Sequence, residues 1–328
     1  MTDPFTVDVL VTEADRRRAV EEDVRSGLST RPRSIPPVWF YDEVGSLLFD
    51  RITRLPEYYL TRAERAILEA HSADIAGASG AETLVEIGSG TSEKTRLLLD
   101  AMAARGSLRH IVLVDISEQV LRVAAGELEQ RYRVPVHAVI GDLRRDLVRL
   151  PRPGRQLWAF LGSTIGNFEP AARAALLSQF RQAMGADDAL LLGTDLRKDV
   201  DRLLAAYDDS EGVTARFNLN VLEVLDTTLG ADFDPRRFEH RAVWNAANSW
   251  IEMRLRSTSE QQVKIPALDM VIELEEGEEI LTEISTKFDR SSLPGELAGS
   301  GLEVGSSWTD PAGDFLLTLA RPGPSALR

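Results

Sequence analysis

TLVEIGSGTSEKTRLLLDAM, residues 83–102, runs from a short apolar segment through two glycines into a segment with helical spacing. The apolar part, 83–87, is typical of a buried strand, and 91–102 is predicted to be a helix with Thr91 or Ser92 as its N-cap. Glycines at the end of a strand let a ligand approach the backbone closely. Because α/β sheets bind ligands beyond the carboxyl ends of their strands, the stretch predicts an α/β fold with a ligand site at Gly88–Gly90.

The alternation of strands and helices continues towards the C-terminus. Further strands are expected at 110–116, 134–143 and 189–196 and at the start of 156–168, and helices at 117–131 and 169–184. This order predicts a Rossmann-like parallel sheet with helices on both faces. After about residue 198 the pattern changes, because 199–229 has helical spacing and several strands follow within 238–275. A second, smaller α+β domain is therefore expected.

The composition excludes several classes of function. The 328 residues include 38 Lys and Arg against 52 Asp and Glu, a net charge of −14 without a basic block, so no binding to nucleic acid is expected. The chain has no cysteine, and its four histidines lack metal-site spacing, so no metal is expected either. With no secretory signal and no apolar stretch of the ~18 residues that span a membrane, we expect a monomeric cytoplasmic protein without membrane contact.

The glycine motif limits the classes of ligand that the site can bind. The string GSGTSE lacks the third glycine of a dinucleotide-binding fingerprint, which argues against an NAD(P) oxidoreductase. It also lacks the lysine of a phosphate-binding loop. Taken alone, Gly88 and Gly90 are equally compatible with a simple tight turn. Asp115 and Asp142, however, end the next two predicted strands, where a carboxylate can accept ribose hydroxyls or an adenine amino group. The motif resembles motif I of the class I methyltransferases, which bind S-adenosylmethionine (SAM).

Longer stretches resemble one family, the histidine Nα-methyltransferases of ergothioneine biosynthesis. They run in order over nearly the whole chain, and the tyrosine-rich N-terminal stretch and LTEISTKF are more specific than the glycine loop. They are PPVWFYDEVGSLLFDRITRLPEYYLTRAE (36–64), LVEIGSGTSEKT (84–95), FLGSTIGNF (160–168), LLLGTDLRKD (190–199), AYDDSEGVTARFNLN (206–220), LTEISTKF (281–288) and WTDPAGDF (308–315).

The resemblance implies an enzyme with a split architecture. Residues 62–198 and 286–328 would form a SAM-binding methyltransferase domain, and residues 1–61 and 199–285 a substrate-recognition domain. The expected reaction is transfer of methyl groups from SAM to the α-amino group of free L-histidine, three times in succession to give hercynine. This is the first step of ergothioneine biosynthesis.

The resemblance also assigns residues to the two ligands. Gly88 and Lys94 would contact SAM, with Asp115 on its ribose and Asp142 near its adenine. Leu143 departs from expectation, since an aromatic residue beside Asp142 would pack better on the adenine. Asn167, Tyr41, Tyr58 and Tyr207 would hold the amine and carboxylate of histidine, Glu283 and Ser285 its imidazole, and Met253 would lie close by.

Alternatives remain open from the residues alone. Trp39, Phe40, Tyr58 and Tyr59 are also compatible with a core, Asn167 with a turn after Gly166, and Glu283 with a solvated acidic run. Another amino acid such as tryptophan could be the substrate, although a carboxylate at 283 suits imidazole better than indole. A non-catalytic SAM-binding protein is also possible, because fold does not dictate function.

Overall fold

The computed structural model describes residues 5–90, 92–143 and 145–323. The chain divides into two compact units. Unit 1 comprises the chain up to Val11, Arg62–Arg197 and the chain from Phe288 onward; unit 2 comprises Thr12–Thr61 and Lys198–Lys287. None of the helices in the described part of the chain contains an apolar segment of the length that a lipid bilayer requires.

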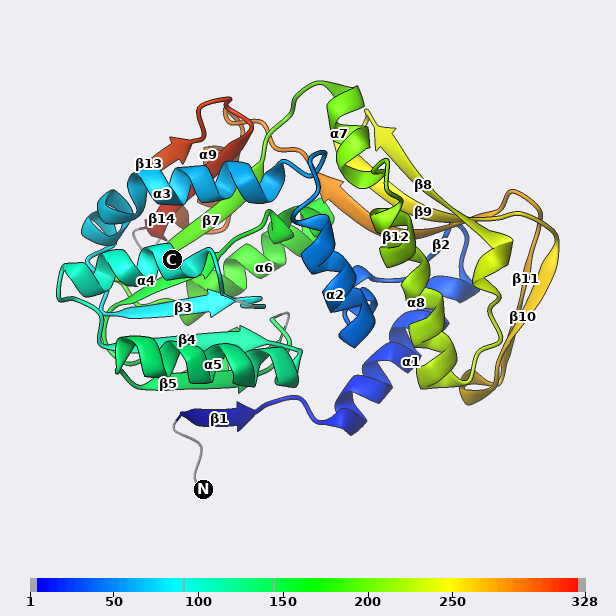
Figure 1. Ribbon diagram of the computed structural model, residues 1–328, viewed down its shortest axis with the longest axis horizontal. Coiled ribbons are helices and arrows are strands. Elements are labelled where there is room, and N and C mark those ends of the chain that lie inside the picture. Colours follow the sequence, from blue (N-terminus) through cyan, green and yellow to red (C-terminus); the bar gives the residue numbers. More distant parts are fainter. Residues whose placement is uncertain (1–4, 91, 144, 324–328) are drawn as a thin grey trace. The chain divides into compact units, whose positions relative to one another are not determined.

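Unit 1 is built on an eight-stranded sheet in the order β1-β5-β4-β3-β6-β7-β14-β13. In this order, the first six strands are parallel to one another. Strand β14 pairs antiparallel with β7, and β13 pairs antiparallel with β14. Figure 1 shows β1, β5, β4 and β3 following one another across the sheet. The strands are β1 (Thr6–Val9), β3 (Thr83–Ile87), β4 (His110–Asp115), β5 (Val136–Ile140), β6 (Gln156–Phe160), β7 (Ala189–Asp195), β13 (Leu302–Thr309) and β14 (Phe315–Pro322).

Helices join these strands by crossover connections. From β3 the chain moves to β4 and β5 on one side and later to β6 and β7 on the other. Because such connections are right-handed, the helices of the two halves cover opposite faces of the sheet, and β3 and β6 mark the switch point where α/β folds bind ligands. The helices are α3 (Leu60–Ser79), α4 (Thr95–Ala104), α5 (Glu118–Tyr132), α6 (Pro170–Ala183) and α9 (Leu293–Gly299), with short turns η2 (Leu147–Arg149) and η3 (Thr164–Asn167). The predicted α/β class and its helix-covered parallel sheet are confirmed.

The core of unit 1 follows from its apolar strands. All five residues of β3, all five of β6 and all seven of β7 are buried, as expected for parallel strands covered on both faces. On one face, Trp158 and Phe160 pack against Phe180 of α6, with ring centroids 6.0 Å and 5.4 Å apart. This core fixes the strand ends that carry the predicted SAM residues.

Unit 2 combines a four-stranded sheet, in the order β2-β12-β9-β8, with a separate hairpin of β10 and β11. Its long helix α8 packs on α2 and contacts β8 and β9. The strands are β2 (Arg33–Ser34), β8 (Phe238–Asn245), β9 (Trp250–Ser257), β10 (Gln261–Ile265), β11 (Met270–Leu274) and β12 (Glu279–Thr286). The helices are α1 (Glu13–Ser29), α2 (Glu43–Ile52), α7 (Val200–Tyr207) and α8 (Val213–Leu229), with turns η1 (Pro37–Phe40), η4 (Pro235–Arg237) and η5 (Pro266–Leu268).

The units differ from the predicted domains at three boundaries, one of them by the single residue Lys198, which was expected in the methyltransferase domain but belongs to unit 2. The chain up to Val11 was expected in the recognition domain, but Thr6–Val9 pairs in parallel with β5 and so extends the sheet of unit 1. An edge strand of four residues is too short to be distinguished by its pattern from loop. At the third boundary, Thr286 and Lys287 were expected in the methyltransferase domain, but they belong to unit 2, where Thr286 pairs with Trp250.

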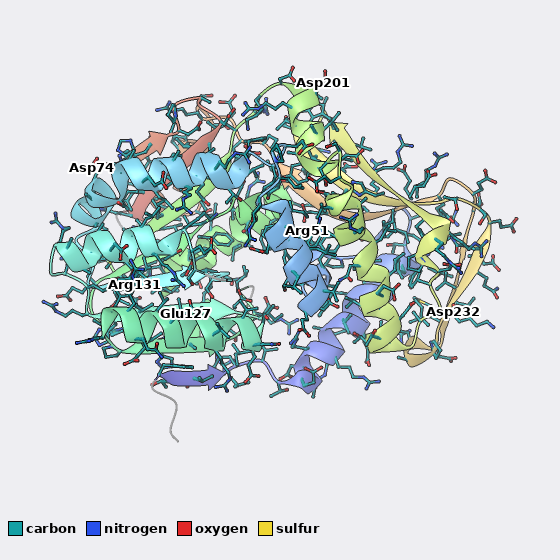
Figure 2. All side chains as sticks on the ribbon, viewed as in Figure 1. Arg51, Asp74, Glu127, Arg131, Asp201 and Asp232 are labelled. Carbon is teal, nitrogen blue, oxygen red and sulfur yellow. The ribbon has the colours of Figure 1, made fainter. Side chains whose placement is uncertain are left out.

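Charge lies mainly at the surface. The six side chains labelled in Figure 2, Arg51, Asp74, Glu127, Arg131, Asp201 and Asp232, are all exposed. Arg131 forms an ion pair with Asp100 at 2.8 Å with both side chains about half exposed. Exposed pairs of this kind contribute at most about 1 kcal/mol each, so the burial of apolar surface dominates stability.

Two glycines inside helices test how tightly the helices pack. Gly27 lies inside α1, which continues to Ser29, and a Cβ at Gly27 would lie 2.1 Å from the carbonyl oxygen of Ser34. Gly27→Ala should therefore destabilise the protein by about 1–3 kcal/mol. At Gly295, in α9, no described atom outside its chain neighbours and the backbone of its own helix lies within 4 Å of the same position, so Gly295→Ala should stabilise the protein by about 0.5 kcal/mol. Urea unfolding of both variants measures the difference, and equal effects would contradict the packing of α1 on β2.

Candidate functional site

The glycine loop follows β3 at the switch point of the sheet. Gly88 and Gly90 have φ values of 70° and 47°, and among the described residues no atom beyond their chain neighbours lies within 4 Å of a Cβ built on either of them. A side chain would strain the backbone and would fill the space in front of the loop. The loop therefore offers a bare backbone surface to a ligand.

Asp115 holds this loop against the end of β4. Its carboxylate accepts hydrogen bonds from the backbone N–H of Gly90 at 3.0 Å and of Ser117 at 2.9 Å. These two bonds fix the carboxylate next to the glycines. Asp115, the residue predicted to bind the ribose, and the glycine loop thus form one local structure.

The segment after the loop differs from the predicted helix start. Helix α4 begins at Thr95, and Ser92 has a φ of 54°, so Ser92 is not its N-cap. The hydroxyl of Ser92 instead donates to Glu86 at 2.6 Å, and Thr95 donates to the other oxygen of the same carboxylate. The alternative cap, Thr91, lies outside the described residues. The hydroxyl of Ser92 therefore satisfies the buried carboxylate of Glu86 and does not cap the N-terminus of α4.

Lys94 pairs with a buried acid that the sequence did not reveal. Its ammonium forms an ion pair with Glu64 of α3, whose side chain is fully buried. The other oxygen of Glu64 accepts the backbone N–H of Gly162 at 2.8 Å, just beyond β6. Glu64 therefore ties α3 to the segments after β3 and β6. No sequence signal marks Glu64, because a glutamate in a helix is usually exposed.

The remaining predicted residues of unit 1 also follow strand ends. Asp142 and Leu143 come after β5, where the backbone N–H of Asp142 donates to Asp146 at 3.0 Å and Leu143 packs against the core. Asn167 ends the turn η3 after β6. Because the carboxyl ends of parallel strands meet at one edge of a sheet, Gly88, Asp115, Asp142 and Asn167 share that edge.

In unit 2 the predicted tyrosines lie within an aromatic cluster. Tyr41 contacts Phe49 and Phe217, both with ring centroids 5.6 Å apart from its own. Tyr58 lies 6.4 Å from Phe49 and 6.3 Å from Tyr207. Tyr58 and Tyr207 are buried and Tyr41 is half-buried, so the cluster brings together the three predicted tyrosines.

A β-bulge sets which side chains of β12 face α7 and α8. Ile280 pairs with Leu255 and Glu283 pairs with Met253, so one extra residue, Thr282, lies between partners that are two residues apart. Side chains alternate along a strand, and the bulge therefore turns Glu283 to the face of Met253. Without it, Thr282 would occupy that position. The hydroxyl of Thr282 lies 2.6 Å from Asn218 Oδ1 and 3.0 Å from the Met253 carbonyl, which anchors the bulge.

The alternation then places Ser285 and Lys287 on the same face as Glu283. All three are buried, with exposed fractions of 8%, 3% and 1%. The Tyr207 and Ser285 hydroxyl oxygens are 2.7 Å apart, and Lys287 donates to Tyr207 at 2.8 Å and to Ser285 at 2.9 Å. Burial raises the pKa of Glu283 to about 7, although the Lys287 charge lowers it. The predicted site did not include Lys287, although its place in the alternation Glu283, Ser285, Lys287 could have indicated it.

His240 holds the end of α7 in place. Its Nε2–H donates to the carbonyl of Tyr207 at 2.8 Å, and its Nδ1 accepts from the Asn218 amide at 2.8 Å. Burial lowers the pKa of His240, although the Tyr207 carbonyl and nearby acids raise it, so the neutral ring is favoured. His240 thus positions Tyr207 through the backbone.

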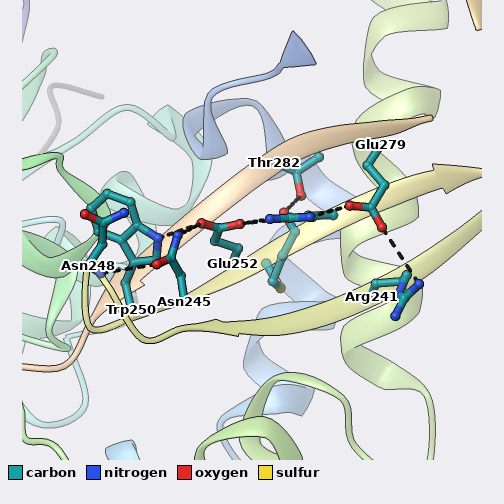
Figure 3. Close-up of polar contacts among 9 residues, drawn as sticks. Arg241, Asn245, Asn248, Trp250, Glu252, Glu279 and Thr282 are labelled. Atoms are coloured by element: carbon teal, nitrogen blue, oxygen red, sulfur yellow. Dashed lines mark hydrogen bonds and ion pairs between the residues drawn. The ribbon is translucent and has the colours of Figure 1, made fainter. Parts of the chain in front are cut away.

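The opposite face of this sheet carries a separate polar network (Figure 3). Glu252 accepts from the indole of Trp250 at 2.7 Å and from Asn245 at 2.8 Å, and its other oxygen accepts from Arg254. Burial raises the pKa of Glu252, but these hydrogen bonds outweigh it and the pKa is lowered. Arg254 also pairs with Glu279, so the network ties β9 to β12 without contributing to the predicted site.

Comparisons with known proteins give the family. The sequence profile of the histidine-specific, SAM-dependent methyltransferases matches residues 20–322. The chain belongs to this family. A histidine N-alpha-methyltransferase of Mycobacterium tuberculosis is 54% identical over 303 residues, 92% of this chain and 94% of that protein. Its counterpart in Mycolicibacterium smegmatis is 53% identical over the same shares of each chain.

A more distant relative is ergothioneine biosynthesis protein 1 of Neurospora crassa, 34% identical over 227 residues, 66% of this chain and 26% of that protein. Membership of the family agrees with the α/β sheet, and the predicted class I methyltransferase fold is confirmed. The methyl donor of the family is SAM. Among the described residues, no group of three or more His, Asp or Glu could hold a metal ion.

Glu86 gives this family member a measurable pH signature. Burial raises its pKa to about 7, although Ser92, Thr95 and Lys94 lower it. The carboxyl contributes stability that is complete below about pH 4.5 and is lost as the pH rises towards 7, because only the folded state penalises the charge. Glu86→Gln removes this titration. The difference in the free energy of unfolding, variant minus wild type, should rise by on the order of 2–3 kcal/mol between pH 4.5 and 8. A difference that stays constant with pH would contradict a buried, titrating Glu86.

Proposed function

We propose that this protein transfers methyl groups from SAM to the α-amino group of L-histidine, three times in succession to give hercynine, the first step of ergothioneine biosynthesis. The family match over residues 20–322 carries the proposal, because that range includes every residue assigned to histidine. The relatives named as histidine N-alpha-methyltransferases support the same substrate along nearly their whole length.

The residues of unit 1 fit SAM. The glycine loop leaves the space that a ligand lying on the backbone requires, and Asp115 presents a carboxylate already held by two N–H groups. We assign the ribose hydroxyls to Asp115, the adenine to Asp142 and Leu143, and further contacts to Gly88 and Lys94. When bound, SAM supplies a methyl group on a positively charged sulfur. Since Lys94 is paired with Glu64, its contact with a SAM carboxylate would extend an existing ion pair.

The residues of unit 2 fit the imidazole of histidine. A buried carboxylate at Glu283 accepts a ring N–H, and the hydroxyl of Ser285 can bond the second ring nitrogen. Met253 pairs directly with Glu283 across the sheet and provides apolar surface beside it. Buried polar partners penalise a substrate that leaves them unpaired, so indole and aliphatic side chains fit poorly.

The amine is assigned to groups without charge. Tyr41 offers a hydroxyl, and the resemblance also assigns Asn167, whose side-chain carbonyl can accept an N–H. Tyr58 is assigned to the carboxylate of histidine, and Tyr207, whose hydroxyl oxygen can accept an N–H, to the amine. An α-amino group has a pKa of roughly 8, so a fraction is neutral near pH 7 and can react without a strong base. In each transfer a nitrogen–carbon bond forms, the sulfur–carbon bond breaks and, in the first two, a proton leaves the nitrogen for solvent.

A mass-spectrometric assay tests this function. Purified protein is incubated with SAM and an equimolar mixture of the twenty free amino acids. We expect mono-, di- and trimethylated histidine alone, ending as the trimethyl betaine. Methylation of tryptophan or another amino acid instead would overturn the substrate. Measurable SAM binding without any methylated product would indicate a non-catalytic SAM-binding protein.

A reciprocal pair of variants tests whether Glu283 binds histidine and Asp115 binds SAM. Glu283→Ala should raise the KM for histidine by roughly 10- to 150-fold, since hydrogen bonds to charged groups contribute about 1.5–3 kcal/mol, and should leave the Kd for SAM unchanged. Asp115→Ala should weaken SAM binding by a similar factor. Titration calorimetry with SAM and steady-state kinetics with histidine measure both, and each variant is the control for the other. Loss of SAM affinity in Glu283→Ala would show that Glu283 is misassigned.

A further inference from the structure

Lys287 is a buried lysine to which the proposed function gives no role. Its side chain is 1% exposed and its ammonium lies 4.5 Å from the centre of the Tyr207 ring. A buried ammonium is costly unless it is hydrogen-bonded. It donates hydrogen bonds to Tyr207 and Ser285, which are also bonded to each other. The three side chains form a closed triangle of hydrogen bonds, which we call the Lys287 triangle.

The chemistry of an ammonium sets the direction of these bonds. An ammonium carries only donors, so the oxygens of Tyr207 and Ser285 must both accept from it. One of the two hydroxyl protons is used in the bond between Tyr207 and Ser285, in whichever direction that bond runs. The other hydroxyl proton then points outside the triangle. The Lys287 triangle therefore presents a donor to its surroundings.

Glu283 presents the opposite polarity beside the triangle. It lies two residues before Ser285 on the same face of β12, and its buried carboxylate is acceptor-only when ionised. The Lys287 charge favours that ionised form. A ring that meets both groups must offer one N–H and one lone pair. Neutral imidazole offers this combination, whereas imidazolium offers two N–H groups and an apolar ring offers neither.

We propose that Lys287 is a positioning residue that sets the hydrogen-bond polarity of the histidine site, by compelling the Tyr207–Ser285 pair to donate while Glu283 accepts. The inference rests on the proposed function and deepens it. The site thereby selects the neutral imidazole, with its N–H towards Glu283 and its lone pair towards the Lys287 triangle. Without the ammonium, the Tyr207–Ser285 pair can turn around and accept, so the site loses its preference.

The first test is Lys287→Met, which keeps the length of the side chain and removes its charge. The KM for histidine should rise by roughly tenfold or more, the value of about one hydrogen bond to a charged group, with kcat within about threefold and an unchanged Kd for SAM. The preference for histidine over thienylalanine, an amino acid with an apolar five-membered ring, should fall by a similar factor. An unchanged KM and preference, or an equal loss of kcat and SAM binding, would overturn the proposal.

A double-mutant cycle tests whether Lys287 acts through Ser285. If it does, Lys287→Met should add little to the KM in a Ser285→Ala background, because the group it positions is already missing. Fully additive effects on log KM would contradict the proposal. Circular dichroism and SAM affinity serve as folding controls for all variants.

Chemical rescue distinguishes the ammonium from simple packing. The chain contains no cysteine, so Lys287→Cys creates a single thiol. Alkylation with 2-bromoethylamine in urea, followed by refolding, converts it into a side chain with an ammonium at nearly the position of the lysine. The KM for histidine should return towards that of wild type carried through the same treatment. A refolded, alkylated protein that stays deficient would overturn the proposal.

The outcomes separate this inference from the proposed function. If the wild-type protein does not methylate histidine in the amino acid mixture, the proposed function fails. If it does, and Lys287→Met behaves like wild type, only the role of Lys287 fails.

Discussion

The one-residue bulge between Leu281 and Glu283 is the constraint on which unit 2 depends. Side chains alternate along β12, so a single inserted residue decides which set faces α7 and α8. With the bulge, Glu283, Ser285 and Lys287 lie on the inner face. Thr282, the inserted residue, is held by Asn218 and by the Met253 carbonyl. A polar site in the middle of a sheet thus rests on one register shift and the hydroxyl that anchors it.

Both units bury an acid next to a lysine. In unit 1, Glu64 is fully buried, pairs with Lys94 and accepts the Gly162 N–H; in unit 2, Glu283 is buried near Lys287. Such groups stabilise a fold weakly, since desolvation offsets most of the attraction between them. Their value lies in orientation, because a buried charge permits only those arrangements that satisfy it. Each unit therefore contains a polar cluster whose hydrogen-bond directions are set before a ligand arrives.

Neutral groups complete this preorganisation. His240 is held in one tautomer between the Tyr207 carbonyl and Asn218, and Asn218 is in turn bonded to Thr282. The same amide therefore supports both the bulge and the end of α7. A disturbance at Asn218 would reach Glu283 through Thr282 and Tyr207 through His240. This shared support explains why a polar asparagine occupies a fully buried position in α8.

The α/β class, the strand ends and the family could be predicted from the sequence. TLVEIGSG, Asp115 and Asp142 are local signals, because strand periodicity and the residues that follow a strand lie next to each other in the chain. The resemblance, carried by LTEISTKF and the tyrosine-rich stretch, supplied the substrate residues. The polar partners could not be predicted in this way: Lys94 pairs with Glu64, Lys287 donates to Tyr207 and Ser285, and Ser92 donates to Glu86. These contacts join segments distant in sequence or depend on a bulge and a left-handed residue, and burial, which gives them their energy, is a property of the packed chain.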